Sequence, residues 1–211
     1  MRWIGMKPTL SKRFLHMTLM MMAAAGAASA QNSDLGLLLG VISPSYSVGV
    51  GPGARVSADA GAACQINYAY QIKGWQAADL YMEFPFFLAG RGNTLDAPGL
   101  SDDSGAFIAA ITPGLRLKVR LGGRVSFYAA AGGGIGWFND NEVLAAPGSY
   151  RISGNTTVTG AFDVGGGLDF RLTRLLSLRP EIRDLITTHS SLSAYNSHNN
   201  PIYAFGLAFH F

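Results

Sequence analysis

A histidine and a serine near the C-terminal end are the residues that come nearest to a catalytic arrangement. His189 and Ser191 stand two positions apart in the segment His189-Ser190-Ser191. A serine becomes a nucleophile when a nearby base takes its proton, and a third group must orient that base. No Asp or Glu follows Asp184, so nothing downstream supplies the orienting acid. A nucleophile and a base without an acid to orient the base do not predict an enzyme.

Metal and cofactor patterns are no better supported. The segment Asn139-Asp140-Asn141-Glu142 offers oxygen ligands but lacks the spacing of a calcium loop. The four histidines show no metal-ligand spacing, and no helical pattern follows the glycine run at 132–136, so that run is not a phosphate loop. We therefore expect no catalytic, cofactor-binding or metal site.

Most charged residues of the second half alternate with large apolar residues. Arg116, Lys118 and Arg120 fall on one face of a strand whose other face is leucine and valine. If the apolar faces meet lipid, the charges point inward. The inward set then comprises Asp79, Glu83, Asp163, Asp169 and Glu181, with Arg116, Lys118, Arg120, Arg171, Arg179 and Arg183.

The last segment decides which face is outside. Tyr203, Phe205, Leu207, Phe209 and Phe211 share one face, and the other is mostly Ala and Gly. A soluble protein normally shows charge to water rather than Ala and Gly, so the large apolar face is expected outside, against lipid. Charges inside must be paired, and the interior of eight strands is just wide enough for side chains. We expect a packed, ion-paired interior, not an open pore.

Period-two alternation dominates the chain and predicts eight strands. They span 34–42, 60–72, 76–89, 105–121, 124–138, 157–172, 175–188 and 202–211. Tight connections alternate with long polar ones at 43–59, 90–104, 139–156 and 189–201. An even strand number with short turns at one end and long loops at the other is typical of outer-membrane barrels. The predicted fold is all-β: an eight-stranded antiparallel up-and-down transmembrane barrel.

The first thirty residues read as a cleaved secretory signal peptide. Arg2, Lys7, Lys12 and Arg13 precede an apolar run, and Ala28-Ser29-Ala30 supplies a small-residue cleavage site. Four of the sixteen basic residues and none of the thirteen acidic ones lie in this segment, so the mature chain has a net charge near −1. The basic balance is thus no evidence for nucleic-acid binding.

Composition narrows the class of the remaining residues, 31–211, which we expect to form one domain. Charged residues make up 14% and hydrophobic residues 48% of the chain, yet no later run is apolar and long enough for a membrane helix. The single Cys64 allows no intramolecular disulfide and is read as a small apolar residue on a strand.

Glycines and aromatic residues give two further hypotheses. Gly132, Gly133, Gly134 and Gly136 could make room for arginines that cross the lumen, or mark a bend in that strand. The aromatic residues predict two interface girdles. The turn-side girdle is Tyr68, Tyr70, Trp75, Phe209 and Phe211, and the loop-side girdle is Trp137, Phe138 and Tyr203. A bulge or loop start is expected where the alternation slips, at Asp184-Leu185.

The C-terminal part resembles a known family. The segment 165–172, the charged segment 176–183 and a closing strand that ends on Phe211 resemble small outer-membrane proteins of the OmpA-like and OmpW-like barrel type. The resemblance implies a location in the bacterial outer membrane. It also implies that the barrel assembly machinery reads the last strand. We expect no counterpart of the peptidoglycan-binding domain of full-length OmpA, and therefore no cell-wall tethering role.

Three functions remain open. The first is a monomeric barrel with a structural, surface-binding or narrow-passage role, in contact with lipid and with an unknown extracellular ligand on its loops. The second is an outer-membrane acyl hydrolase, because His189 and Ser191 resemble the His-x-Ser pair of lipid A deacylases. Leu192 replaces the following Asn of that motif. The third is a secreted soluble barrel that binds an apolar ligand.

Extraction behaviour separates the first and third functions. We expect the protein to sediment with outer membranes and to need detergent for release, because its apolar faces contact lipid. Fractionation of expressing cells measures this. Appearance of the folded protein in the periplasm without detergent would favour the soluble barrel.

Overall fold

The computed structural model describes residues 32–43, 47–51, 53–97, 100–146, 149–187 and 199–211, which form β-strands and no helix. No helix able to cross a membrane occurs in this part of the chain. The strands are β1 (Ser33–Ile42), β2 (Ser47–Gly51), β3 (Ala54–Ala58), β4 (Gly61–Gly74), β5 (Ala78–Ala97), β6 (Leu100–Ile111), β7 (Gly114–Arg120), β8 (Val125–Ala146), β9 (Ser149–Arg171), β10 (Leu176–Thr187) and β11 (Pro201–His210).

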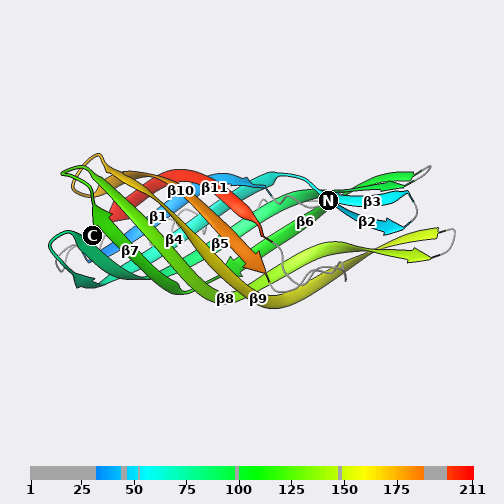
Figure 1. Cartoon of the computed structure of the whole chain (residues 1–211), viewed down its shortest axis with the longest axis horizontal. Helices are drawn as coiled ribbons and strands as arrows, with labels where there is room; N and C mark the ends of the chain where they lie inside the picture. The colour runs from blue at the N-terminus through cyan, green and yellow to red at the C-terminus, as the bar shows by residue number, and fades with distance from the viewer. Residues whose placement is uncertain (1–31, 44–46, 52, 98–99, 147–148, 188–198) are drawn as a thin grey trace, which may run out of the picture.

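Antiparallel pairing closes these strands into a barrel (Figure 1). Around the wall the order is β1, β4, β5, β6 with β7, β8, β9, β10 and β11. The barrel closes where β1 pairs with β11, for example at Leu37 and Leu207. Backbone hydrogen bonds of 2.9 Å in both directions join Ser33 to Phe211, so both ends of the wall lie at the same rim. The prediction of a closed eight-stranded antiparallel barrel is confirmed.

β6 and β7 share one position in the wall. Each pairs with β5 on one side and with β8 on the other. The sequence predicted one continuous strand over 105–121, but the ladder is interrupted at Thr112 and Pro113. Proline has no N–H to donate to a ladder, so strands break or bulge there. The Pro113 carbonyl still accepts a hydrogen bond of 3.1 Å from the Gly133 amide.

The two ends of the barrel differ as expected, but the long connections are more ordered than predicted. Short turns join β4 to β5, β7 to β8 and β9 to β10, and Figure 1 shows them at the rim that holds the C-terminus. At the other end β5 and β6, and β8 and β9, run on as paired hairpins through the predicted loops 90–104 and 139–156. Within 43–59, β2 and β3 form a third hairpin that pairs with β5.

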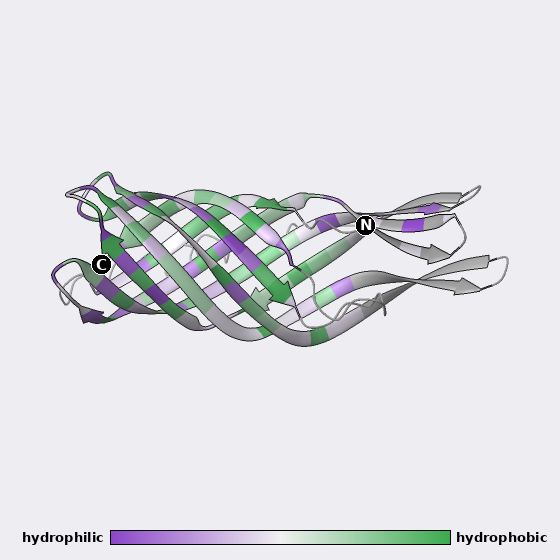
Figure 2. Ribbon diagram, viewed as in Figure 1, coloured by the Kyte–Doolittle hydropathy of each residue, from purple (hydrophilic) through white to green (hydrophobic). Residues whose placement is uncertain are grey.

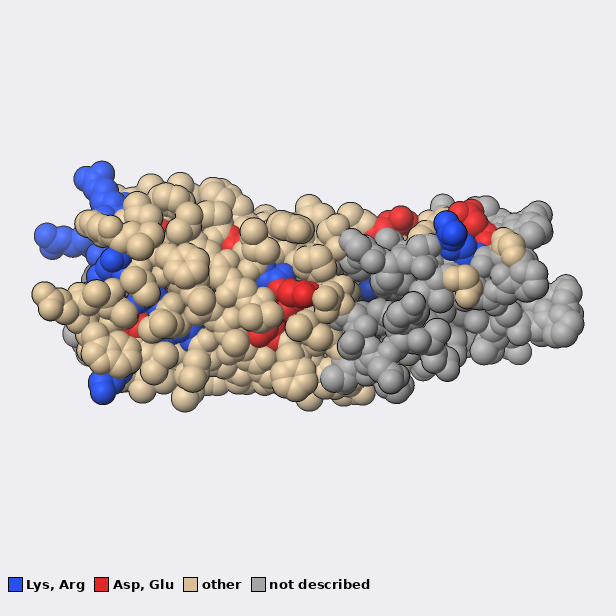
Figure 3. Space-filling model, viewed as in Figure 1, with Lys and Arg blue, Asp and Glu red and all other residues tan. Residues whose placement is uncertain are grey.

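The outward face of the wall is apolar. Leu39, Phe205 and Ile182 expose 71%, 57% and 58% of their surface. Figure 2 shows hydrophobic residues alternating with hydrophilic ones along the barrel strands, and Figure 3 shows a barrel surface that is mostly uncharged, with a few charged groups visible along it and basic residues at the short-turn rim. Monomeric soluble proteins rarely expose apolar patches of this extent. The pattern fits a wall in contact with lipid and not a soluble barrel.

Aromatic residues lie mostly where predicted. Tyr68, Tyr70 and Trp75 point outward towards the short-turn end, and Trp137 and Tyr203 point outward further along the wall. Phe138 is the exception: it is 7% exposed and belongs to a cluster inside the barrel. Strand alternation explains this, because Trp137 and Phe138 are neighbours in sequence and must face opposite sides.

We predict that Phe205→Arg lowers the free energy of unfolding by about 2–4 kcal/mol, because Phe205 lies midway along β11 and a cation there meets the bilayer interior. Urea titration of the barrel folded in lipid vesicles measures this. Phe205→Leu, which keeps an apolar group at the same place, is the matched control. Equal midpoints for the two variants would show that this face does not contact lipid.

Candidate functional site

The half of the lumen nearest the short turns contains a chain of ion pairs. Arg116 Nη1 lies 3.1 Å from Asp34 Oδ1, and Arg179 Nη2 lies 3.1 Å from the other oxygen of the same carboxylate. Arg179 Nε donates to Asp169 at 2.6 Å, and Lys118 Nζ lies 2.5 Å from that carboxylate. Each carboxylate here therefore binds two cations, which offsets the desolvation of both.

The chain continues towards the middle of the barrel. Arg116 Nε donates to Glu83 at 3.2 Å, and Arg183 Nη2 lies 2.6 Å from Glu83 Oε1. Arg183 also binds Glu181 at 2.7 Å and contacts Asp163. The four cations and five carboxylates thus form one connected network, which we call the ionic network. It comprises Asp34, Glu83, Arg116, Lys118, Asp163, Asp169, Arg179, Glu181 and Arg183.

Neutral side chains complete this network. Glu181 accepts hydrogen bonds from Gln65 Nε2 at 2.5 Å and from the Tyr128 hydroxyl. The Tyr128 ring faces two guanidinium groups, with Arg116 at 4.7 Å and Arg179 at 5.2 Å from its centroid. Cation–π contacts of this kind gain strength when both partners are dry. Tyr128 therefore links the two ends of the network.

The network binds the wall together. Its charged members come from β1, β5, β7, β9 and β10, and β4 and β8 add Gln65 and Tyr128. β11 contributes no charged member to the network, and its inward positions there are Ala204, Gly206 and Ala208. Near the rim, its His210 Nε2 lies 2.8 Å from Ser177 Oγ of β10.

Nine of the eleven residues in the predicted inward set are buried, and eight of those nine belong to the network. The ninth, Asp79, pairs near the rim with Arg120, whose side chain is 48% exposed. Arg120 and Arg171 were predicted to point into the closed interior, but both lie at the short-turn rim with exposed side chains. The alternation of apolar and polar residues assigned both arginines to the correct face of their strands. It does not show at which residue the closed lumen ends.

Sequence reasoning missed several members of the site. Asp34, 1% exposed, bridges two arginines, and Gln65, Asn67 and Tyr128 are fully enclosed. The signal for Asp34 was present: alternation over 34–42 places it on the same face as Gly36, Leu38, Gly40 and Ile42. That face is mostly apolar, so nothing marked it as part of a charged interior.

Beyond the network, towards the hairpin end, the lumen contains a cluster of apolar side chains. This cluster, which we call the apolar plug, consists of Ile42, Ala63, Phe87, Ala89, Ile108, Ala110, Phe138, Ala161, Leu185 and Ile202. The change of polarity follows each strand: along β10, inward Arg183 is succeeded by inward Leu185, and along β5, inward Glu83 is succeeded by inward Phe87.

The apolar plug explains the apparent slip at Asp184-Leu185. No bulge occurs there, since β10 pairs with β9 in unbroken register from Glu181 to Thr187. Leu185 is buried because the lumen is apolar at that level, and Asp184 falls on the outer face. The expected bulge or loop start was therefore wrong: the alternation is intact, and the polarity of the inward face changes.

The arginines do gain room from glycines, but at other positions than predicted. A Cβ at Gly36 would lie 3.1 Å from Arg179 Nη1, and one at Gly165 would lie 2.8 Å from Arg183 Cγ. At Gly132 the nearest side chain is instead Asp163, and at Gly136 it is Phe138. The glycines of β8 thus make room for a carboxylate and an aromatic ring.

The remaining candidates fall into two groups. His189 and Ser191 lie outside the described residues. The segment 139–142 continues β8, and Cys64 is a free thiol half-buried on β4. Among the described residues, no group of three His, Cys, Asp or Glu side chains could hold a metal ion.

We predict that Glu181→Leu lowers the free energy of unfolding by about 3–5 kcal/mol, because Arg183, Gln65 and Tyr128 lose a common acceptor and one buried cation loses a partner. Arg120→Gln, which removes a half-exposed ion pair, should cost no more than about 1 kcal/mol. Urea midpoints and heat-modified gel mobility measure both. Equal loss in the two variants would contradict the assignment of Glu181 to the network.

No protein-family model matches the sequence, and no curated protein sequence matches it. Solved structures do. The outer membrane protein OprG from Pseudomonas aeruginosa is similar over 86% of this chain and 96% of its own, with 15% identity and a TM-score of 0.53. Neisserial surface protein A (NspA) is similar over 86% and 98%, with 13% identity and a TM-score of 0.53.

The outer membrane enzyme PagL is more distant, with 11% identity over 83% of this chain and 98% of its own and a TM-score of 0.40, and adds nothing to the hydrolase hypothesis. At these identities the likeness to OprG and NspA concerns the fold. Together with the apolar outer face of the wall, that fold is the fold of a small transmembrane β-barrel.

Proposed function

We propose that this chain is a monomeric, sealed outer-membrane barrel that anchors external β-hairpins for surface binding, and that it neither conducts ions nor catalyses a reaction. The observation that carries the proposal is the filling of the lumen at two successive levels. Arg116 and Arg179 are 0% exposed in the ionic network, and Ile108 and Leu185 are 0% exposed in the apolar plug. Water therefore has no access to these side chains at either level.

The two levels oppose ion passage in different ways. At the ionic network, a permeant ion has to break pairs in which each partner would be left charged and dry, which costs several kcal/mol. At the apolar plug, the side chains of the cluster are apolar and cannot replace the hydration shell of the ion. An eight-stranded barrel has no spare width for a path around these side chains.

The hairpins are the part of the molecule suited to recognition. β5 with β6 and β8 with β9 continue their ladders beyond the apolar band, and β2 with β3 adds a further edge. Binding residues are commonly carried on connecting segments held by a rigid scaffold. We therefore expect the hairpins to be the part of the chain that binds an extracellular ligand.

The last strand supports membrane insertion through the barrel assembly machinery. Tyr203, Phe205, Leu207 and Phe209 of β11 face outward in alternation, and the chain ends on Phe211 one residue beyond the strand. This pattern suits recognition of β11 as the closing strand, next to β1.

We predict that the purified protein shows no steady conductance in a planar lipid bilayer, because both levels of the lumen are closed. An open sixteen-stranded porin inserted in the same bilayer is the positive control, since its lumen holds an aqueous channel. Steady current steps from the unmodified protein would overturn the sealed-barrel proposal and favour a narrow passage.

We also predict that replacing residues 143–152 by a short turn leaves the free energy of unfolding within about 0.5 kcal/mol of the parent, the range for changes away from structural features. This segment of β8 and β9 pairs only with itself. Urea titration in vesicles measures the effect. Loss of the folded barrel would mean that this hairpin is structural and not presented.

A further inference from the structure

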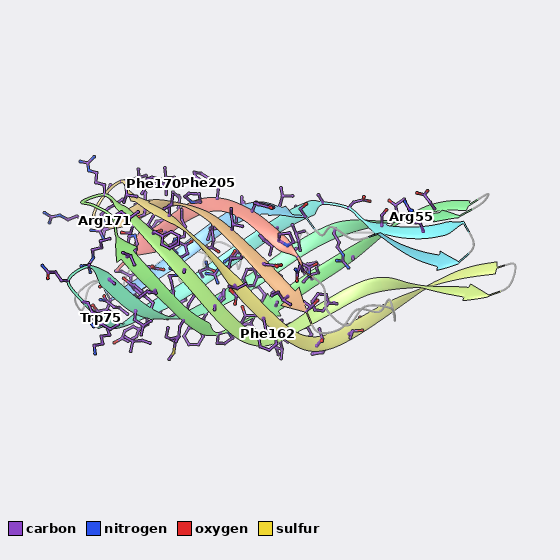
Figure 4. All side chains as sticks on the ribbon, viewed as in Figure 1. Arg55, Trp75, Phe162, Phe170, Arg171 and Phe205 are labelled. Carbon is purple, nitrogen blue, oxygen red and sulfur yellow. The ribbon has the colours of Figure 1, made fainter. Side chains whose placement is uncertain are left out.

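A polar cavity opens at the short-turn end of the lumen, on the far side of the ionic network from the apolar plug. Its volume is about 250 Å³. Lys118, Arg120, Arg124 and Arg171 bring positive charge to its lining, together with the Ser126 hydroxyl. Figure 4 places Arg171 at this end of the barrel. We call this space the rim cavity.

The two acidic side chains in the lining are already occupied. Asp79 binds Arg120 at 2.5 Å and accepts a hydrogen bond of 3.0 Å from Gln71. Asp169 binds Lys118 at 2.5 Å and Arg179 at 2.6 Å. Four basic against two acidic side chains leave the lining with a net charge of +2 when His210 is neutral.

Arg124 and Arg171 hold this excess charge. They stand side by side across the β8–β9 ladder, where the Arg171 amide donates to the Arg124 carbonyl at 2.8 Å. Neither guanidinium is in an ion pair with any described carboxylate. Every other arginine or lysine of the lining has a carboxylate partner. These two are therefore the ones available to a ligand.

We propose that the rim cavity binds a phosphate group. Guanidinium groups bind phosphate oxygens through paired, charge-assisted hydrogen bonds, and a lysine ammonium adds a point charge. A phosphate monoester carries a charge of about −1.5 to −2 at pH 7, which matches the lining. A carboxylate would neutralise only half of it, and a cation would be repelled. The low-dielectric wall around the cavity strengthens its positive potential.

The shared chemistry admits two sources, a soluble phosphate and the headgroup of an anionic lipid. The short-turn rim is the periplasmic end in barrels of this kind, so the lipid would belong to the inner leaflet. That placement rests on the orientation of the proposed function. Phosphate binding by the purified protein does not depend on that orientation. The phosphate proposal and the proposed function can therefore fail separately.

Isothermal titration of the detergent-solubilised protein with sodium phosphate, at constant ionic strength, tests the proposal. We expect saturable binding that weakens at least tenfold in the double variant Arg124→Gln/Arg171→Gln. The control is Lys73→Gln/Arg174→Gln, which removes the same charge at the same rim from residues outside the cavity lining. The control should retain the parent affinity within twofold, and heat-modified gel mobility verifies folding of each variant.

No saturable binding by the parent, or equal weakening in both double variants, would overturn the proposal, since the rim would then act only by its total charge. Titration in nanodiscs identifies the source. If phosphatidic acid lowers the apparent phosphate affinity tenfold relative to phosphatidylcholine, the cavity takes the lipid headgroup. An affinity that is the same in both lipids assigns a soluble phosphate.

Discussion

Burial of charge in a dry lumen is the constraint on which the rest of this structure depends. The effective cost of taking an ion out of water is several kcal/mol, and an opposite charge offsets it only in good geometry. Arg116, Arg179 and Arg183 meet that condition by binding carboxylates from other strands, such as Asp34 and Glu83. These ion pairs can form only if each strand keeps its register with its neighbours.

The lumen does not carry charge along its whole length, and this matters for stability as well as for sealing. Beyond Arg183 and Glu83 the inward positions become Leu185 and Phe87, which contribute apolar burial without the desolvation of a charge. The interior thus combines a part that specifies which strands meet with a part that packs like an ordinary protein core. Asp163 lies at the boundary, contacting Arg183 while one of its oxygens has no partner among the described residues.

Much of this architecture could be predicted from the sequence, because lipid outside and charge inside impose a period of two. Alternation gave the strand number, the faces and most of the charged interior. It failed where that contrast disappears. Leu185 and Phe138 face inward where the lumen is apolar, so one looked like a slip and the other like an interface residue. The hairpins at 90–104 and 139–156 looked like loops because both faces of a strand in water are polar. Partner choice, such as Asp34 between two arginines, depends on how strands meet across the lumen.

The length of β8 and β9 has a consequence for where this protein can touch other molecules. Strands of 22 and 23 residues extend about 70 Å at roughly 3.3 Å per residue. A strand tilted by about 40° needs only around 12 residues to cross a hydrocarbon core of about 30 Å. Some ten residues of each strand therefore stand clear of the hydrocarbon as a hydrogen-bonded stalk, roughly 30 Å long. The outer end of this stalk could therefore contact a ligand that is too large to approach the lipid headgroups.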